Sequence, residues 1–233
     1  MAMLKSFRGE ELQNGVAFMD AATRSVFIAK VYNLLFAVIA LMVAAGFVAF
    51  KKVEIPISQG MFFALFFAPL GVLLIGAFTK KIKGLNLILF AVYGILEGLF
   101  LGVLAKAYAE AGLGTIFAQA AILSLLVFGG LTAFVHISKK DFSFLGAFLS
   151  ILIFVLLGAV LVGFFVKSTT FHLIISAGGT ALFALYILFD TSQVLYHVHE
   201  DESVSAAWML FIDLIGLFIY ILNLLTILSG NRD

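Results

Sequence analysis

Three acidic residues of this sequence stand inside long apolar stretches, where lipid is the expected surrounding. They are Glu97, Asp190 and Asp213. A charge at the centre of a bilayer costs at least about 2.5–3.5 kcal/mol, so such a residue tends to face a partner or a water-filled cavity. The three acids are therefore the first candidates for a functional role.

Asp190 and Asp213 are expected to lie at similar depth on two consecutive helices. Asp190 comes shortly before one apolar run ends at residue 195, and Asp213 comes shortly after the next run begins at residue 206. At about 1.5 Å per residue, they lie roughly 7–8 Å and about 10 Å from the same membrane face. The spacing predicts their depth and leaves their direction around each helix open.

Two carboxyl groups held close together in a poorly solvated site cannot both ionise cheaply, so such a pair shares a proton. The pair would act as a proton-sensitive switch. When deprotonated, Asp190 and Asp213 would also be candidate Ca²⁺ ligands, because Ca²⁺ prefers oxygen. The alternative interpretation is that each aspartate only caps or hydrogen-bonds a neighbouring helix.

Polar or small side chains recur every three or four residues around both aspartates, which is the spacing of one helix face. The two stripes consist of Tyr186, Asp190, Gln193 and His197, and of Asp213, Gly216, Tyr220 and Asn223. Tyr186, Gln193, Tyr220 and Asn223 are therefore candidate partners of the pair.

Three further charged residues are candidate partners of the pair. Glu97 either lines the same polar interior or hydrogen-bonds locally in protonated form. Lys80 and Lys81 stand at the inner end of the second apolar run. They either reach the aspartates by snorkelling or anchor the helix at the cytoplasmic face.

The elements that position these residues are predicted to be membrane helices. Of 233 residues, 64% are hydrophobic and 12% charged, whereas a soluble domain has roughly 45–50% and about 25%. This composition excludes a soluble enzyme, a nucleic-acid binder and a disordered chain. The apolar runs are long and continuous, which argues against a β-barrel. The absence of cysteine excludes disulfides and thiolate sites.

Seven apolar runs are long enough to cross a bilayer. They cover residues 27–50, 61–79, 85–107, 115–135, 142–166, 171–195 and 206–229. We expect an all-α membrane protein, a seven-transmembrane helical bundle. A polar cytoplasmic segment, residues 1–25, would precede a single membrane domain, residues 26–233. Nine Lys and Arg residues fall on one side and five on the other, which predicts a cytoplasmic N-terminus and an outside C-terminus.

Glycines recur every four residues in the third run, at Gly94, Gly98 and Gly102. This places them on one helix face, where another helix can approach closely. The face predicts tight packing, either within the chain or against another membrane protein.

Four segments in order resemble the Bax inhibitor-1 (transmembrane BAX-inhibitor-motif) family. Residues 185–193 and 211–225 are similar to its sixth-helix and seventh-helix signatures, and Lys30-Val-Tyr32 and residues 97–102 are also similar. The resemblance implies a bundle with a central seventh helix. It also implies a pH-sensitive calcium leak channel in which Asp190 and Asp213 are proton sensor and gate. Lys80 or Lys81 would fill the place of a basic residue that pairs with an aspartate.

The resemblance further implies a bacterial member in the inner membrane. We expect no enzymatic activity, no nucleic-acid partner and no cofactor, with Ca²⁺ only as the permeant ion. The alternative function is an interaction protein that regulates another membrane protein, such as a membrane-bound protease. An intramembrane aspartyl protease is disfavoured because Leu210-Phe-Ile precedes Asp213, without the Gly-x-Gly-Asp signature. The loop 197–202 is interpreted as a solvated acidic loop rather than a metal site.

Overall fold

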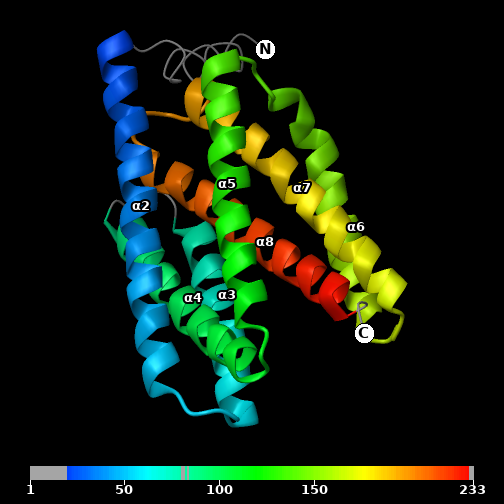
Figure 1. Ribbon diagram of the computed structural model, residues 1–233. Coiled ribbons are helices and arrows are strands. Elements are labelled where there is room, and N and C mark those ends of the chain that lie inside the picture. The colour runs from blue at the N-terminus through cyan, green and yellow to red at the C-terminus, as the bar shows by residue number, and fades with distance from the viewer. Residues whose placement is uncertain (1–19, 80–81, 83, 231–233) are drawn as a thin grey trace. The chain divides into compact units, whose positions relative to one another are not determined.

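The computed structural model describes residues 20–79, 82 and 84–230. Within these ranges the chain forms seven α-helices and one short 3₁₀-helix, η2, without a β-strand (Figure 1). The elements are α2 (Ala21–Lys52), α3 (Gln59–Phe78), α4 (Leu85–Glu110), α5 (Gly114–Ser138), η2 (Ser143–Leu145), α6 (Gly146–Gly163), α7 (Thr169–Tyr196) and α8 (Ser203–Gly230).

All seven helices are long and apolar enough to cross a membrane. This confirms the predicted all-α, seven-span fold. A helix is the expected form of these runs because lipid offers no partner for backbone N–H and C=O groups, which must pair within the segment. The predicted segment 1–25 lies mostly outside the described residues.

The helix ends differ from the predicted runs by a few residues. α2 begins at Ala21 instead of residue 27, because Asp20 accepts a hydrogen bond from the Thr23 N–H and caps the helix there. α6 ends at Gly163, three residues earlier than predicted. Ser168 then caps the start of α7 by accepting a hydrogen bond from the Phe171 N–H at 3.3 Å. The polar caps Asp20 and Ser168, which hydropathy does not register, set the starts of α2 and α7.

The chain divides into two compact units. One unit contains residues 30–117, with most of α2 and all of α3 and α4. The other combines the first turns of α2 with the chain from residue 118 onward, which carries most of α5 and all of α6, α7 and α8. The three acids are therefore distributed over both units, with Glu97 in the first and the two aspartates in the second.

Within the first unit, α2 and α4 meet backbone to backbone at the glycine face. A Cβ atom at Gly98 would collide with the carbonyl oxygen of Met42, and one at Gly102 with that of Gly46. A Cβ at Gly46 would in turn lie 3.1 Å from the Gly98 oxygen. The predicted close approach is confirmed, and its partner is a helix of the same chain.

Within the second unit, α7 is packed between α6 and α8 (Figure 1). Leu149 and Leu156 of α6 and Leu182 of α7 form a buried apolar cluster. Half of the most apolar stretch of α8 is buried, the largest share among the seven spans.

Candidate functional site

Asp190 and Asp213 come together at the α7–α8 interface. Asp190 lies in the last two turns of α7 and Asp213 in the third turn of α8. Both residues are buried, with exposed fractions of 7% and 4%. Their side chains are close enough to share a hydrogen bond. Since a hydrogen bond between two carboxyl groups needs a proton on one of them, this arrangement fits a proton-sharing pair.

The surroundings of the pair are poor in other partners. Among the described residues, none gives a hydrogen bond to Asp213 Oδ2. Tyr186, one turn before Asp190, lies within electrostatic reach of both carboxyl groups, but its hydroxyl donates to the Leu149 carbonyl oxygen at 3.1 Å. If both carboxyl groups were ionised, two negative charges would stand close together in a buried place.

Two glycines fix the register of α7 against α8. The Phe183 ring lies against Gly216 of α8, and the Tyr220 ring lies against Gly179 of α7; a Cβ atom at either glycine would overlap the ring. Each helix thus offers a notch to an aromatic ring of the other. Because these contacts interlock, they hold Asp190 and Asp213 at matching height.

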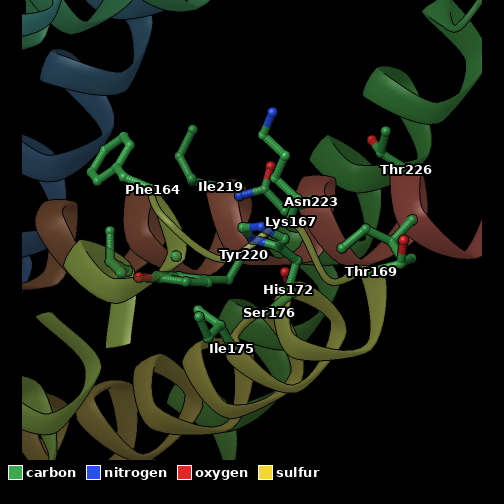
Figure 2. Close-up of a pocket in the computed structure, with 13 residues that line it drawn as sticks. Phe164, Lys167, Thr169, His172, Ile175, Ser176, Ile219, Tyr220, Asn223 and Thr226 are labelled. Carbon is green, nitrogen blue, oxygen red and sulfur yellow. The ribbon is translucent and has the colours of Figure 1, made fainter. Parts of the chain in front are cut away.

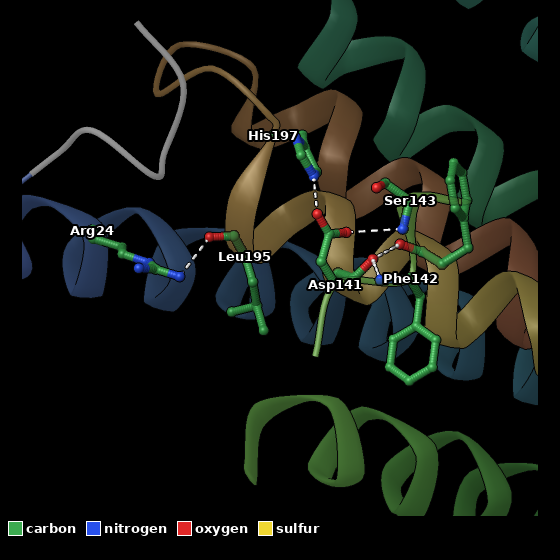
Figure 3. Close-up of polar contacts among 8 residues, drawn as sticks. Arg24, Asp141, Phe142, Ser143, Leu195 and His197 are labelled. Carbon is green, nitrogen blue, oxygen red and sulfur yellow. Dashed lines mark hydrogen bonds and ion pairs between the residues drawn. The ribbon is translucent and has the colours of Figure 1, made fainter. Parts of the chain in front are cut away.

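The end of α7 beyond Asp190 is held by the loop before η2. The His197 ring contacts Asp141 Oδ2 at 2.8 Å, and the Ser143 N–H donates to Asp141 Oδ1 at 2.8 Å (Figure 3). The Phe142 N–H donates to the Ser192 hydroxyl at 3.1 Å. Burial acts to raise the pKa of Asp141, but the hydrogen bonds from Ser143 and His197 outweigh it and hold that pKa below its ordinary value.

Arg24, in the first turns of α2, also holds the end of α7. Its guanidinium donates to the Leu195 carbonyl oxygen at 2.7 Å (Figure 3) and lies 5.1 Å from the centre of the Tyr196 ring. A cation at a helix C-terminus satisfies free carbonyl groups and the helix dipole. The sequence did not predict this role, because Arg24 only counted as one of the basic residues that predict the orientation of the chain in the membrane.

Replacing Asp141 with asparagine is expected to lower the free energy of unfolding by about 0.2–1 kcal/mol at neutral pH, the range of an exposed ion pair. The pKa of Asp141 is depressed in the folded state, so its contribution is present above the ordinary aspartate pKa of about 3.9 and is lost as pH falls through the lower folded value. Thermal unfolding in detergent at stepped pH checks this. Asp201→Asn, in the exposed loop, is the control and should show no such difference.

The remaining predicted partners lie in several places. Gln193 is half-buried on α7, and His197 is exposed. Tyr220 and Asn223 line a cavity near the opposite end of α7 (Figure 2). Among the described residues of the two predicted stripes, Tyr186 is the one that interacts electrostatically with both aspartates.

Glu97 is buried on α4, one turn after Tyr93. It belongs to the first compact unit, and its predicted place beside the aspartates stays a prediction. Lys80 and Lys81 lie outside the described residues, so their role stays a prediction as well. Within the described ranges, no group of three or more His, Asp or Glu residues could hold a metal ion.

Fold and site together define a seven-helix integral membrane protein with a buried pair of acids on its last two helices. The family described as "Inhibitor of apoptosis-promoting Bax1" matches residues 24–230. The chain therefore belongs to the Bax inhibitor family, as the four sequence segments predicted.

Several relatives support this membership. A Campylobacter jejuni protein is 34% identical over 222 residues, which is 94% of each chain. The Golgi anti-apoptotic protein of vaccinia virus is 30% identical over 218 residues, 92% of this chain and 90% of its own. Bax inhibitor 1 of Schizosaccharomyces pombe is 40% identical over 149 residues, 64% of this chain and 54% of its own. Relatives thus include bacterial proteins, as expected.

Proposed function

We propose that this protein is a pH-sensitive cation leak, with Ca²⁺ as the permeant ion, and that Asp190 and Asp213 form its gate. The observation that carries the proposal is the buried pair of carboxyl groups on α7 and α8, which are close enough to share a hydrogen bond. Intramembrane acids are expensive and commonly mark ion or proton pathways. The role requires no enzymatic chemistry and no resident cofactor.

The proposed gate works through the charge of the pair. With one shared proton, the carboxyl groups attract each other and hold α7 against α8. Loss of that proton sets two negative charges against each other at close range, which favours separation of the helices. The same charges then offer oxygen ligands to a passing cation. Two carboxylates supply fewer than the six to eight oxygens of a stable Ca²⁺ site. A Ca²⁺ ion would therefore bind to the pair only briefly as it passes.

The proposal places the protein in a bacterial inner membrane with its N-terminus in the cytoplasm and its C-terminus outside. The excess of Lys and Arg on the N-terminal side supports this orientation. The aspartate pair would then lie in the cytoplasmic half of the bilayer. The contacts of Arg24, Asp141 and His197 would hold α7 near the cytoplasmic surface.

Reconstituted vesicles loaded with a Ca²⁺ dye test the proposal. The double variant Asp190→Asn plus Asp213→Asn is expected to lose pH-dependent Ca²⁺ flux, because an amide pair has no proton to exchange in this range. Asp201→Asn plus Glu202→Gln removes two acids from the exposed α7–α8 loop and should keep the wild-type response. Unchanged pH-dependent flux in the Asp190/Asp213 double variant would refute the aspartate gate.

A second candidate function is regulation of another membrane protein, such as a membrane-bound protease. Two relatives, Bax inhibitor 1 and Golgi anti-apoptotic protein, have names that favour a regulatory role. The glycine face of α4, however, is already used by α2, so it does not offer a free docking surface. Crosslinking in native membranes distinguishes the two functions, since a stable partner retained by the Asp190/Asp213 double variant would favour regulation.

A further inference from the structure

A cavity of about 600 Å³ lies where the end of α6, the start of α7 and the last turns of α8 meet (Figure 2). Its wall combines apolar side chains with several polar ones. The polar residues are Lys167, Thr169, His172, Ser176, Tyr220, Asn223 and Thr226. This end of α7 is opposite to the end that carries Asp190, so the cavity is separate from the aspartate pair.

Two hydroxyl groups in this cavity indicate that it holds water. Ser176 is 5% exposed, and among the described residues no hydrogen bond involves its hydroxyl. Tyr220 is half-buried, and none of the hydrogen bonds among the described residues involves its hydroxyl either. Both residues line the cavity, and a polar cavity of this size has room for water that would pair with their hydroxyl groups. Lys167 and Asn223 also line the cavity and are exposed, so water would enter the cavity beside them.

Three aromatic rings follow one another along α7 and α8 from this cavity towards the aspartates. Tyr220, which lines the cavity, stacks on Phe183 with ring centres 5.7 Å apart and planes at 26°. Phe183 in turn lies 6.1 Å from the ring of Tyr186. Gly216, which receives the Phe183 ring, is three residues after Asp213, or about 4.5 Å along the helix. The stack therefore reaches from the cavity to the neighbourhood of the pair.

We propose that the cavity is a hydrated vestibule and that the stacked rings of Tyr220 and Phe183 are an apolar gate between it and Asp190 and Asp213. Apolar constrictions in channels stop ions by excluding water. The rings sit in the notches at Gly179 and Gly216, so a small separation of α7 from α8 would release both. The gate rests on the proposed leak function, because it places a second barrier in series with the aspartates.

Cysteine accessibility tests the vestibule, because the sequence has no cysteine of its own. Ser176→Cys should react with a membrane-impermeant methanethiosulfonate reagent from the same side as Lys167→Cys. Leu182→Cys, in the buried apolar cluster, is the control and should react at least tenfold more slowly than Ser176→Cys. Equal, slow reaction of the Ser176 and Leu182 variants would overturn the vestibule.

The gate is tested with a reporter at Tyr186→Cys. Adding Tyr220→Ala should raise its labelling rate from the Lys167 side at least tenfold, whereas Tyr220→Phe, which keeps the ring, should leave the rate unchanged. Phe183→Ala should act like Tyr220→Ala. Equal rates with alanine and phenylalanine at residue 220 would overturn the gate. Size-exclusion elution confirms that each variant is folded.

The labelling result is independent of Ca²⁺ transport. If labelling follows the expected pattern while no variant carries Ca²⁺, the vestibule and the ring barrier stand and the leak function fails. If the aspartates control Ca²⁺ flux while Tyr220→Ala changes neither labelling nor flux, the leak function stands and the gate fails.

Discussion

Replacing Gly98 or Gly102 with valine is expected to abolish folding of the α2–α4 pair. A Cβ atom at either position would overlap a carbonyl oxygen of α2, at Met42 or Gly46. A backbone atom cannot rotate away as a side chain can, so α2 and α4 would have to separate along this contact. Overpacking a tight interior typically costs about 1–3 kcal/mol, and we expect at least the upper value here.

The measurement is the yield of monodisperse protein in detergent, followed by thermal unfolding of whatever is recovered. Gly71→Val is the matched control, because it makes the same change in α3 of the same unit with no atom within 4 Å of the added Cβ. The control should unfold within a few degrees of wild type. Wild-type stability of Gly98→Val would contradict the close backbone contact.

Removing either aspartate alone is expected to flatten the pH response of Ca²⁺ flux as completely as removing both. The proposed gate opens through repulsion between two carboxylates, and an aspartate beside an asparagine can still ionise but has no second charge to repel it. Flux controlled by one such proton changes by at most about tenfold per pH unit. Asp190→Asn, Asp213→Asn and the double variant should all lose this slope.

A double-mutant cycle measures this dependence. Each single change should reduce the pH slope of Ca²⁺ flux as much as the double change does. The two single reductions should therefore sum to about twice the reduction in the double variant, because residues that act as one unit are not additive. If the single variants each kept half of the slope and the double variant lost all of it, the two carboxyl groups would be independent sensors. That result would contradict the shared proton.

Sequence spacing was sufficient for the features that one helix determines by itself. The lengths of the apolar runs predicted seven helices, and the distances of Asp190 and Asp213 from their helix ends predicted matching depth. The four-residue spacing of Gly98 and Gly102 predicted a close helix contact. Each inference uses the rise or the period of a single helix, which backbone hydrogen bonding sets.

The side chains that meet between particular helices could not be predicted from the sequence. Tyr220 follows the spacing of Asp213, but its ring is held at Gly179, away from the aspartates. Phe183 lies in an apolar run, so nothing in the sequence distinguished it from its apolar neighbours. In the structure its ring fills the notch at Gly216. The contacts of Arg24 and Asp141 with the end of α7 join residues far apart in the chain. Spacing defines a helix face but not the side chain that packs against it.

The central claim is that the proton shared by Asp190 and Asp213 controls cation leak. Infrared titration of the carboxyl C=O band, on the same vesicles in which Ca²⁺ flux is followed, tests it most directly. We predict that a band absent from the Asp190→Asn plus Asp213→Asn variant titrates over the pH range in which wild-type flux changes. A wild-type flux that changes with pH while this band stays constant would contradict the claim.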